Sequence, residues 1–454
     1  MADISKLTLG LAGFGTVGSG LLRILADNKE EILSRTGCDI RIKGVLVRDA
    51  SRPRACPLPE GAYLTTNMED LLEDPEVDVV VELIGGTDKA GQLVERALKA
   101  GKHVVTANKA LLAESGNTYF ALAQEKGLHL AYEASVCGGI PIVQTLRESL
   151  AANRIESLEG ILNGTSNYVL FEMTSGGMSF ADALGKAQEL GYAEADPTLD
   201  IGGGDAAHKL ALLIRLAWGV EYPFKDLPVR GIENVRAEDI RYAREFGYRI
   251  KLLGHARLVG ESLGTGAGIE AHVAPALVHE SLLLAKVGGA FNAVRIEGDA
   301  IGSVFLHGKG AGDMPTGSSV AADILAIARK AAPNNTGFAR PALPCPARVI
   351  PQQEAISPYY IRLSVSDAPG VLRNVAGTLA DNNISIAQVI QKDSSSQPPS
   401  EHADSREPCV PLIVMTHEAA AAGVDKALQH LANSPFVHEP PVYYRVLARR
   451  SVGL

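Results

Sequence analysis

The sequence predicts three successive units: a doubly wound parallel α/β sheet, a looser α+β region, and a smaller unit with the order β-α-β-β-α-β. The first unit is predicted by short β-branched runs that alternate with helical patterns up to about residue 140, and the last by a similar alternation after residue 358. A stretch rich in Pro, Asn and Gln precedes that last unit. We expect units at 1–140, 141–311 and 358–454, a linker at 333–357, and a helix at about 312–332 that packs back on the first unit.

Composition excludes several classes of protein. The 454 residues carry 43 Lys and Arg against 52 Asp and Glu, and a net charge of −9 has the wrong sign for a protein that mainly binds nucleic acid. The longest apolar run, 210–220, is interrupted by Arg215 and is shorter than the ~20 residues of a membrane helix. Five scattered cysteines without CxxC spacing indicate neither a disulfide framework nor a zinc site. No basic and apolar leader is visible, so we expect a cytoplasmic protein without membrane or nucleic-acid partners.

The first unit follows the strand–helix alternation of a parallel sheet. We expect strands at 7–12, 40–47, 77–83, 103–106 and 128–131. We expect helices at 19–28, 69–73, 90–100 and 119–126.

The first strand ends in a GxGxxG pattern formed by Gly13, Gly15 and Gly18. Glycine-rich turns are common in a chain with 46 glycines, but here a strand precedes the turn and a helix follows it. Gly13 permits a tight turn, Gly15 lets a pyrophosphate approach the backbone, and Gly18 lets the helix approach the strand. The helix N-terminus adds free N–H groups. We therefore predict a Rossmann-type dinucleotide-binding domain rather than a purely structural turn.

The end of the second strand bears on the choice of nucleotide. An acidic residue there suits the ribose diol of NAD, whereas a guanidinium suits the 2′-phosphate of NADP. Arg48 follows the strand directly, with Arg52 and Arg54 close by, so NADP(H) is favoured. Asp49 keeps NAD(H) possible, because a register shift of one residue would exchange the two roles. The same basic residues would also fit a solvated loop.

In the middle region, we expect helices at 141–152, 180–190, 206–218 and 317–331. The most unusual stretch, 191–209, places four carboxylates ahead of an apolar helix: Glu194, Asp196, Asp200 and Asp205. Asp205 and Lys209 are four residues apart and share a helix face. Burial lowers the pKa of a lysine and a nearby aspartate opposes that shift, so Lys209 could exchange a proton with a reacting hydroxyl near neutral pH.

Three structural alternatives remain open for this stretch. Asp205 could be a helix N-cap, Lys209 a surface lysine, and the carboxylates a hydrated loop or a site for a hard cation.

The last unit reads as a ferredoxin-like fold. We expect strands at 359–366, 384–391, 411–416 and 441–447, and helices at 369–382 and 418–432. The polar, Pro-containing segment 394–408 is expected to be an insertion between the middle strands.

Residues 187–209 resemble the signature of homoserine dehydrogenases, Ala-x3-Gly-aromatic-Ala-x2-Asp-Pro-x2-Asp-Ile-x-Gly-x-Asp-x3-Lys, without a mismatch. A spaced pattern of this length is far more specific than GxGxxG. Other segments also resemble that family: 81–86, 106–109, 133–136, 162–168 and 308–319. Together, the resemblance covers roughly residues 6–332.

The resemblance implies a reversible hydride transfer between L-aspartate 4-semialdehyde and L-homoserine with NAD(P)H, in threonine and methionine biosynthesis. It implies that Lys209 exchanges the proton of the substrate oxygen, that Asp205 supports it, and that Lys109 lies near the nicotinamide and the substrate. Glu194, Asp200 and Asp205 are expected to hold the ammonium group of the amino acid. Further cofactor contacts are implied for Phe14, Thr16, Val17 and Gly312. A possible sodium site is implied at the carbonyls of Glu133, Val136, Gly138 and Ile140.

Residues 365–372 and 383–386 resemble an ACT domain, a unit that pairs its sheets and often binds amino acids. Threonine, the end product, is the natural candidate effector, and the helix that begins near Pro369 could meet its carboxylate. The unit could instead serve only to join subunits. We expect a homodimer or a homotetramer.

Two rival functions would use other features of the sequence. An aldehyde-oxidising semialdehyde dehydrogenase would need a thiolate nucleophile, and Cys137 is the candidate, although it also fits a small buried residue. A nucleotide- and amino-acid-sensing module would have no use for a proton donor such as Lys209.

Overall fold

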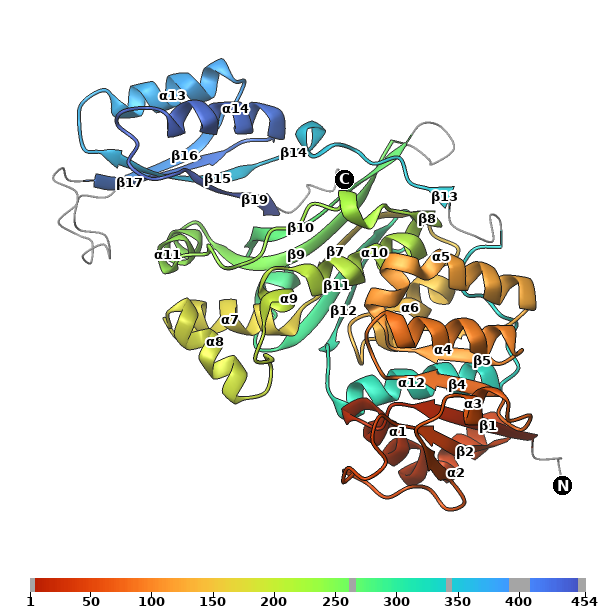
Figure 1. Ribbon diagram of the computed structural model, residues 1–454. Helices are drawn as coiled ribbons and strands as arrows, with labels where there is room; N and C mark the ends of the chain where they lie inside the picture. The colour runs from red at the N-terminus through yellow and green to blue at the C-terminus, as the bar shows by residue number, and fades with distance from the viewer. Residues whose placement is uncertain (1–4, 261–266, 340–344, 392–408, 448–454) are drawn as a thin grey trace.

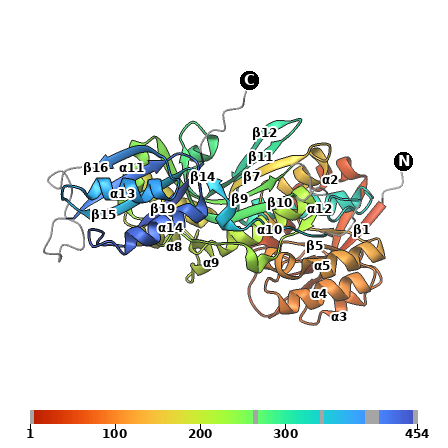
Figure 2. The same ribbon diagram turned by 90° about the horizontal axis from the view of Figure 1, so that it is seen from above.

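The structure, a computed structural model, describes residues 5–260, 267–339, 345–391 and 409–447. The molecule is elongated, with the N-terminal unit at one end, the C-terminal unit at the other and the middle region between them (Figures 1 and 2). In the described ranges, no helix combines the length and apolar character needed to cross a membrane. The segment 394–408, expected to be an insertion, lies outside the described residues.

The predicted doubly wound sheet is confirmed. In the described part of the chain it has six parallel strands in the order β3-β2-β1-β4-β5-β6. The strands span Ser5–Ala12 (β1), Cys38–Leu46 (β2), Tyr63–Thr65 (β3), Val79–Glu82 (β4), His103–Thr106 (β5) and Leu130–Ala131 (β6). The strand order reverses between β1 and β4, which is where such sheets bind nucleotides. The short strand β3 was not predicted, because three residues are too few for a periodic pattern.

The helices of this sheet are Thr16–Asp27 (α1), Lys29–Thr36 (α2), Glu69–Leu72 (α3), Asp88–Lys99 (α4) and Lys109–Lys126 (α5). Helix α2 was not predicted, and α5 begins ten residues earlier than expected. Its start is set by Asn108, whose side chain accepts a hydrogen bond from the backbone N–H of Leu111. Helix α12 (Asp313–Ala328), far away in the sequence, packs against α1.

The middle region and the C-terminal unit share one sheet. In the described residues it has nine strands in the order β12-β11-β7-β9-β10-β19-β15-β17-β16. The middle region supplies Ile155–Ile161 (β7), Tyr248–Val259 (β9), Gly268–His279 (β10), Phe291–Gly298 (β11) and Gly302–Lys309 (β12). The C-terminal unit supplies Tyr359–Ser366 (β15), Ile386–Gln391 (β16), Cys409–Thr416 (β17) and Val442–Leu447 (β19). Strands β10 and β19 join the two halves in parallel, through residues 276–278 and 445–447.

The middle-region helices cover this sheet. They are Ile142–Gln144 (α6), Gly164–Ser175 (α7), Phe180–Glu189 (α8), Thr198–Ile201 (α9), Gly204–Trp218 (α10) and Ala237–Glu245 (α11). The helix expected at 141–152 is α6 followed by a π-helical turn, Thr145–Ser149. Helix α7 was not predicted, because its first residues, Gly-Thr-Ser-Asn, are typical of a turn. Helix α10 is buried along nearly its whole length, and therefore carries its few polar side chains into the interior.

The C-terminal unit has the predicted β-α-β-β-α-β order. Helices Val371–Asp381 (α13) and Ala421–Ala432 (α14) lie on one face of its strands (Figure 1). The stretch before it is anchored at several points. Strand β13 (Cys345–Pro346) pairs with β8 (Val220–Glu221), and Asn335 bonds the backbone at Leu128 and Leu130.

Candidate active site

The turn between β1 and α1 fits the predicted phosphate-binding role. Gly13 has φ of +108°, and a Cβ there would lie 2.5 Å from the carbonyl oxygen of Leu83, so this position requires glycine. A Cβ at Gly18 would collide with the Gly13 carbonyl, whereas one at Gly15 would meet no atom within 4 Å. A pyrophosphate can therefore approach the backbone at Gly15, beside the N-terminus of α1.

The other predicted cofactor residues lie around this turn. Phe14 is buried, Thr16 is exposed and Val17 is half-buried. Gly312 has φ of +123° and caps α12, whose first residue, Asp313, pairs with Arg23 of α1. This ion pair joins the start of α12 to α1, the helix that follows the nucleotide-binding turn.

The loop after β2 presents arginines toward solvent. Arg48 is exposed. Asp49 is occupied locally: its carboxylate accepts hydrogen bonds from the Ser51 N–H (2.9 Å) and hydroxyl (2.6 Å), which hold the pKa of Asp49 below its usual value. The Arg54 guanidinium carbon lies 5.8 Å from the centre of the Phe14 ring, and Arg54 also donates to the Asp49 carbonyl. The loop therefore offers guanidinium groups near the turn, while its carboxylate is already hydrogen-bonded.

Lys209 lies inside the middle region, on the first turns of α10. Its side chain is only 10% exposed, and its Nζ donates to the carbonyl oxygen of Leu162 (2.6 Å) and to Oδ2 of Asp205 (2.8 Å). The predicted sharing of one helix face by Asp205 and Lys209 is therefore seen as a direct ion pair.

Lys109 approaches the same aspartate from the other domain. It is the first residue of α5, directly beyond β5, and its Nζ lies 3.2 Å from Oδ1 of Asp205. Its side chain remains 34% exposed. Asp205 thus holds one lysine on each oxygen, and the two lysines come from opposite sides of the junction between the nucleotide-binding sheet and the middle region.

Asn163 connects the carboxylates of the site. It caps α7 by accepting the Ser166 N–H (2.8 Å), and its Nδ2 donates to both Asp200 Oδ1 (2.7 Å) and Asp205 Oδ2 (2.8 Å). Thr165 adds a hydrogen bond to Asp200 Oδ2 (3.1 Å). Sequence reasoning did not assign a role to Asn163 or Thr165. An Asn directly before Gly-Thr-Ser is an N-cap signal, but nothing local shows which carboxylates the capping side chain also reaches.

The charges in this cluster influence one another. Burial alone would lower the pKa of Lys209, but the charge and hydrogen bond of Asp205, together with other nearby groups such as Asp200, raise it above its usual value. Burial likewise opposes ionisation of Asp205, yet Lys209 and Lys109 hold its pKa below the usual value. Among the described residues no cation forms an ion pair with Asp200, and burial, aided by the charge of Asp205, raises its pKa. The cluster therefore contains an ammonium group at Lys209 and a firmly ionised Asp205.

The other two carboxylates of the loop stand apart. Asp196 accepts hydrogen bonds from the N–H and hydroxyl of Thr198, the first residue of α9. Glu194 is exposed, and among the described residues its carboxylate makes no hydrogen bond or ion pair with Asp200, Asp205 or Lys209. Asp200 and Asp205 are therefore the pair that the fold brings together.

The proposed ion loop is buried beside this cluster. Three of its four expected carbonyl ligands already accept one hydrogen bond: Glu133 from the Val136 N–H (3.3 Å), Gly138 from the Ser319 hydroxyl (2.6 Å) and Ile140 from the Ile142 N–H (2.7 Å). Each carbonyl oxygen keeps a second lone pair. The neutral oxygens fit a weakly bound monovalent cation.

Cys137 lies in the same loop and is fully buried, with φ of +56°. Burial raises the pKa of its thiol. Since the thiolate is the nucleophilic form, this environment disfavours the aldehyde-oxidising chemistry considered for Cys137.

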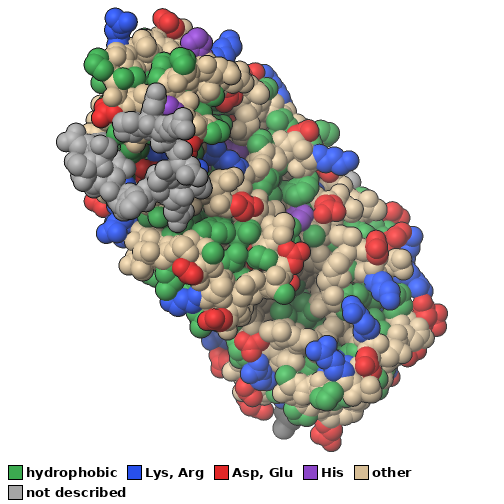
Figure 3. Space-filling model, turned by 60° about the vertical axis from the view of Figure 1, so that its left-hand side comes forward, with side chains coloured by type: hydrophobic (Ala, Val, Ile, Leu, Met, Phe, Trp, Pro, Cys, Tyr) green, Lys and Arg blue, Asp and Glu red, His purple; other side chains and the backbone are tan. Residues whose placement is uncertain are grey.

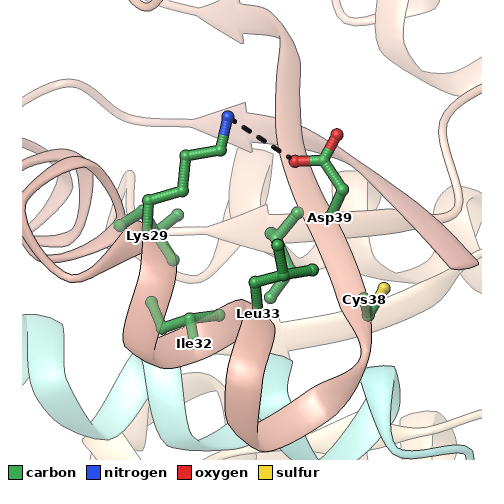
Figure 4. Close-up of a pocket in the computed structure, with 7 residues that line it drawn as sticks. Lys29, Ile32, Leu33, Cys38 and Asp39 are labelled. Carbon is green, nitrogen blue, oxygen red and sulfur yellow. Dashed lines mark ion pairs between the residues drawn. The ribbon is translucent and has the colours of Figure 1, made fainter. Parts of the chain in front are cut away.

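A small cavity elsewhere in the molecule does not qualify as the site. It lies between α1, α2 and β2, is lined by the Lys29–Asp39 ion pair (3.8 Å), and has a volume of about 10 Å³, room for about one water molecule (Figure 4). On the face seen in Figure 3, acidic and basic side chains are interspersed, and the surface is hollowed where the nucleotide-binding and middle regions meet.

Three family models match successive parts of the chain. The model of the homoserine dehydrogenase NAD-binding domain matches 13–133, that of homoserine dehydrogenase matches 141–325, and that of the ACT domain matches 359–435. Homoserine dehydrogenases of Neisseria gonorrhoeae and Pseudomonas aeruginosa are each 42% identical, over 98% of this chain and 99% of theirs.

Solved structures give the same result. A homoserine dehydrogenase from Thiobacillus denitrificans is 43% identical, with a TM-score of 0.89 over 98% of both chains. A hyperthermophilic archaeal homoserine dehydrogenase in complex with NADPH is 27% identical, with a TM-score of 0.60, and covers 72% of this chain and 98% of its own.

These matches include the nucleotide-binding turn, the lysine–carboxylate cluster and the C-terminal unit, in that order. The predicted fold class is thereby confirmed in all three parts. The chain therefore belongs to the homoserine dehydrogenase family, oxidoreductases that act on a CH–OH group, with an NAD-binding domain, a catalytic domain and a C-terminal ACT domain.

Proposed function

We propose that the chain catalyses the reversible, NADP(H)-dependent conversion of L-aspartate 4-semialdehyde to L-homoserine, for threonine and methionine biosynthesis in the cytoplasm. The observation that carries the proposal is the cluster at the domain junction, in which Asp205 lies between Lys209 (2.8 Å) and Lys109 (3.2 Å). This cluster offers a proton donor and a cation-binding surface beside the nucleotide-binding sheet.

The carboxylates would bind the ammonium group of the amino-acid substrate. Asp200 and Asp205 are held at a fixed separation by Asn163, so an ammonium group can meet both. We also propose Glu194, whose side chain is exposed, as a third carboxylate for this ammonium group. Lys109, with its partly exposed side chain, would contact the oxygen or carboxylate of the substrate.

Lys209 would transfer the proton. When bound, the nicotinamide supplies the hydride in the reducing direction and accepts it in the oxidising direction. In reduction, Lys209 protonates the alkoxide that develops at the former carbonyl oxygen, and its raised pKa keeps it charged for this task. In oxidation, the same amine must first lose a proton, so we expect homoserine oxidation to rise with pH and aldehyde reduction to fall.

The arginines after β2 support a preference for NADP(H). Arg48 is exposed and Arg54 lies over the Phe14 ring of the turn, so a 2′-phosphate could meet guanidinium groups here, whereas Asp49, which a ribose diol would need, is bonded to Ser51. We further propose that a sodium ion can bind the carbonyls of Glu133, Val136, Gly138 and Ile140, where it would stiffen the loop that carries Cys137.

The ACT domain suggests regulation by a small ligand. We propose threonine as the effector, because it is the end product of this biosynthesis, and a homodimer or homotetramer as the assembly. A role of the ACT domain in subunit contact alone is the alternative, and a titration with threonine separates the two.

The test is an initial-rate assay with L-homoserine, at matched NADP and NAD, with and without millimolar threonine. We expect reduction of NADP, preferred over NAD, and slowing by threonine.

An Arg48→Ala variant should raise the KM for NADP while leaving the KM for NAD unchanged. The same substitution at Arg35, remote on α2, is the control. Absence of nicotinamide reduction would refute the proposal, and phosphate-dependent aldehyde oxidation lost in Cys137→Ser would favour the rival.

A further inference from the structure

The glycine run before α10 packs against a segment that also contacts the ACT domain. This segment, 229–232, runs alongside β10: the Arg230 N–H donates to the Val273 carbonyl (2.8 Å), and Val229 forms a parallel bridge with Val273. Arg230 extends its side chain to β19, where its guanidinium carbon lies 5.0 Å from the Tyr443 ring centre and 5.6 Å from that of Tyr444. In the described residues no carboxylate pairs with Arg230, and its guanidinium lies over the two aromatic rings of the ACT strand.

The other side of the segment touches the substrate loop. The Ile232 N–H donates to the carbonyl of Ile201 (2.8 Å), the residue after Asp200. At Gly231, a Cβ would collide with that carbonyl and would lie 2.6 Å from Cα of Gly202. At Gly203, with φ of +85°, a Cβ would lie 3.0 Å from Val229. This close packing leaves little free space between the segment and the loop.

We propose that Arg230 is a positioning residue for Asp200 and Asp205, the two carboxylates that would bind the substrate. The stacking of Arg230 on Tyr443 and Tyr444 holds segment 229–232 against the loop 201–203, and the loop in turn places Asp200 on one side and Asp205 on the other. The inference rests on the proposed function for its kinetic effect, but the packing itself does not depend on it. An ACT strand thereby supports the binding site of the catalytic domain.

Arg230→Met tests this by keeping the side-chain stem and removing the cation. We expect the KM for homoserine to rise about three- to thirtyfold, the range for a residue that acts through a neighbour, with kcat and the KM for NADP little changed. Tyr443→Leu should do the same, whereas Tyr443→Phe, which keeps the ring face, should behave as the wild type. Unchanged KM values in both Arg230→Met and Tyr443→Leu would overturn the proposal.

Arg236→Met is the matched control. Arg236 also reaches the ACT domain, where it pairs with Glu439 (2.7 Å), but in the described residues its side chain makes no hydrogen bond or ion pair with loop 201–203. If Arg236→Met raised the KM for homoserine as much as Arg230→Met, the effect would be general loosening of the junction, and the proposal would fail.

Hydrogen exchange of the full-length protein gives a readout that needs no turnover. The amides of Gly202, Gly203 and Ile232 donate to carbonyls within the packed region. They should exchange faster in Arg230→Met and Tyr443→Leu than in the wild type and Arg236→Met. If the wild type failed to oxidise homoserine but exchange changed in this way, the proposed function would fail and the positioning role would stand. Unchanged exchange would refute the positioning role.

Discussion

At the scale of single residues, Asn163 shows how one side chain can organise a charged site. Its amide donates to two carboxylates, Asp200 and Asp205, and its oxygen caps α7. A neutral amide is suited to this place because it satisfies both carboxylates without neutralising either. The carboxylates therefore keep their charge for an ammonium group, and their separation is fixed by one rigid helix start.

Replacement of Asn163 by Ala should therefore raise the KM for homoserine and also lower the stability of the fold. We expect the KM for homoserine to rise by about tenfold or more, since the lost interaction involves charged acceptors. Loss of the cap should cost ~0.5–2 kcal/mol of stability. Ser179→Ala, which removes the exposed cap of α8, is the control with a comparable loss of stability and no kinetic effect. Equal KM values in the two variants would contradict the role given to Asn163.

The raised pKa of Asp200 predicts how kcat/KM for homoserine falls at the acid side of its pH profile. A carboxyl group with a raised pKa takes up a proton while the pH is still above the ordinary Asp range of about 3.9. As the pH falls, Asp200 therefore loses its charge first, and kcat/KM for homoserine should decline with it, whereas Asp205, with its lowered pKa, stays ionised. In Asp200→Asn this decline should disappear, and in Asp196→Asn it should remain. A pH profile of kcat/KM for the three proteins is the measurement.

At the scale of elements, the joint between β10 and β19 depends on a buried acid. Asp239 of α11 is fully buried, and its bonds go to ACT side chains: Arg362 Nε (2.7 Å), Tyr360 (2.9 Å) and Tyr444 (3.5 Å). Burial opposes the charge of Arg362, but Asp239 raises the pKa of this guanidinium well above its usual value. Catalytic and ACT domains are thus joined by main-chain pairing and by a buried ion pair.

Asp239→Asn should loosen this joint, because it leaves Arg362 charged and buried without its partner. Breaking a buried pair in this way costs about 3–5 kcal/mol. Thermal or denaturant unfolding measures the loss. Arg236→Ala removes a more exposed pair across the same joint and should cost at most about 1 kcal/mol. A similar small loss for Asp239→Asn would mean that the buried pair contributes little net stability.

Much of this element structure was predictable from the sequence. The parallel sheet, the glycine turn and the β-α-β-β-α-β order follow from local periodicity, and the Asp205–Lys209 contact follows from helical spacing. The pairing of β10 with β19 could not be predicted in this way, because no local sequence pattern indicates that residues near 277 and 446 pair with each other. The role of Asn163 and the raised pKa of Lys209 were also beyond the sequence, since both depend on which groups the fold brings within about 3 Å.

At the scale of the whole molecule, the ACT domain is part of the catalytic sheet and not an appended module. A chain that ended at residue 355 would expose the edge of β10 and leave Asp239 without its partners. We expect such a truncated chain to aggregate or to melt at a much lower temperature than the full chain. Soluble yield and melting temperature measure this. A stable, fully active truncated protein that merely ignored threonine would contradict this view.

The most direct test of the account is the turnover of Lys209→Ala with homoserine and NADP. We assign to Lys209 the transfer of the substrate proton, so kcat should fall ~10²–10⁴-fold while the protein remains folded. Lys186→Ala, which removes a partly exposed lysine paired with Glu172, should retain wild-type turnover. A Lys209→Ala enzyme with wild-type kcat would contradict the assignment of the proton donor, and with it the proposed mechanism.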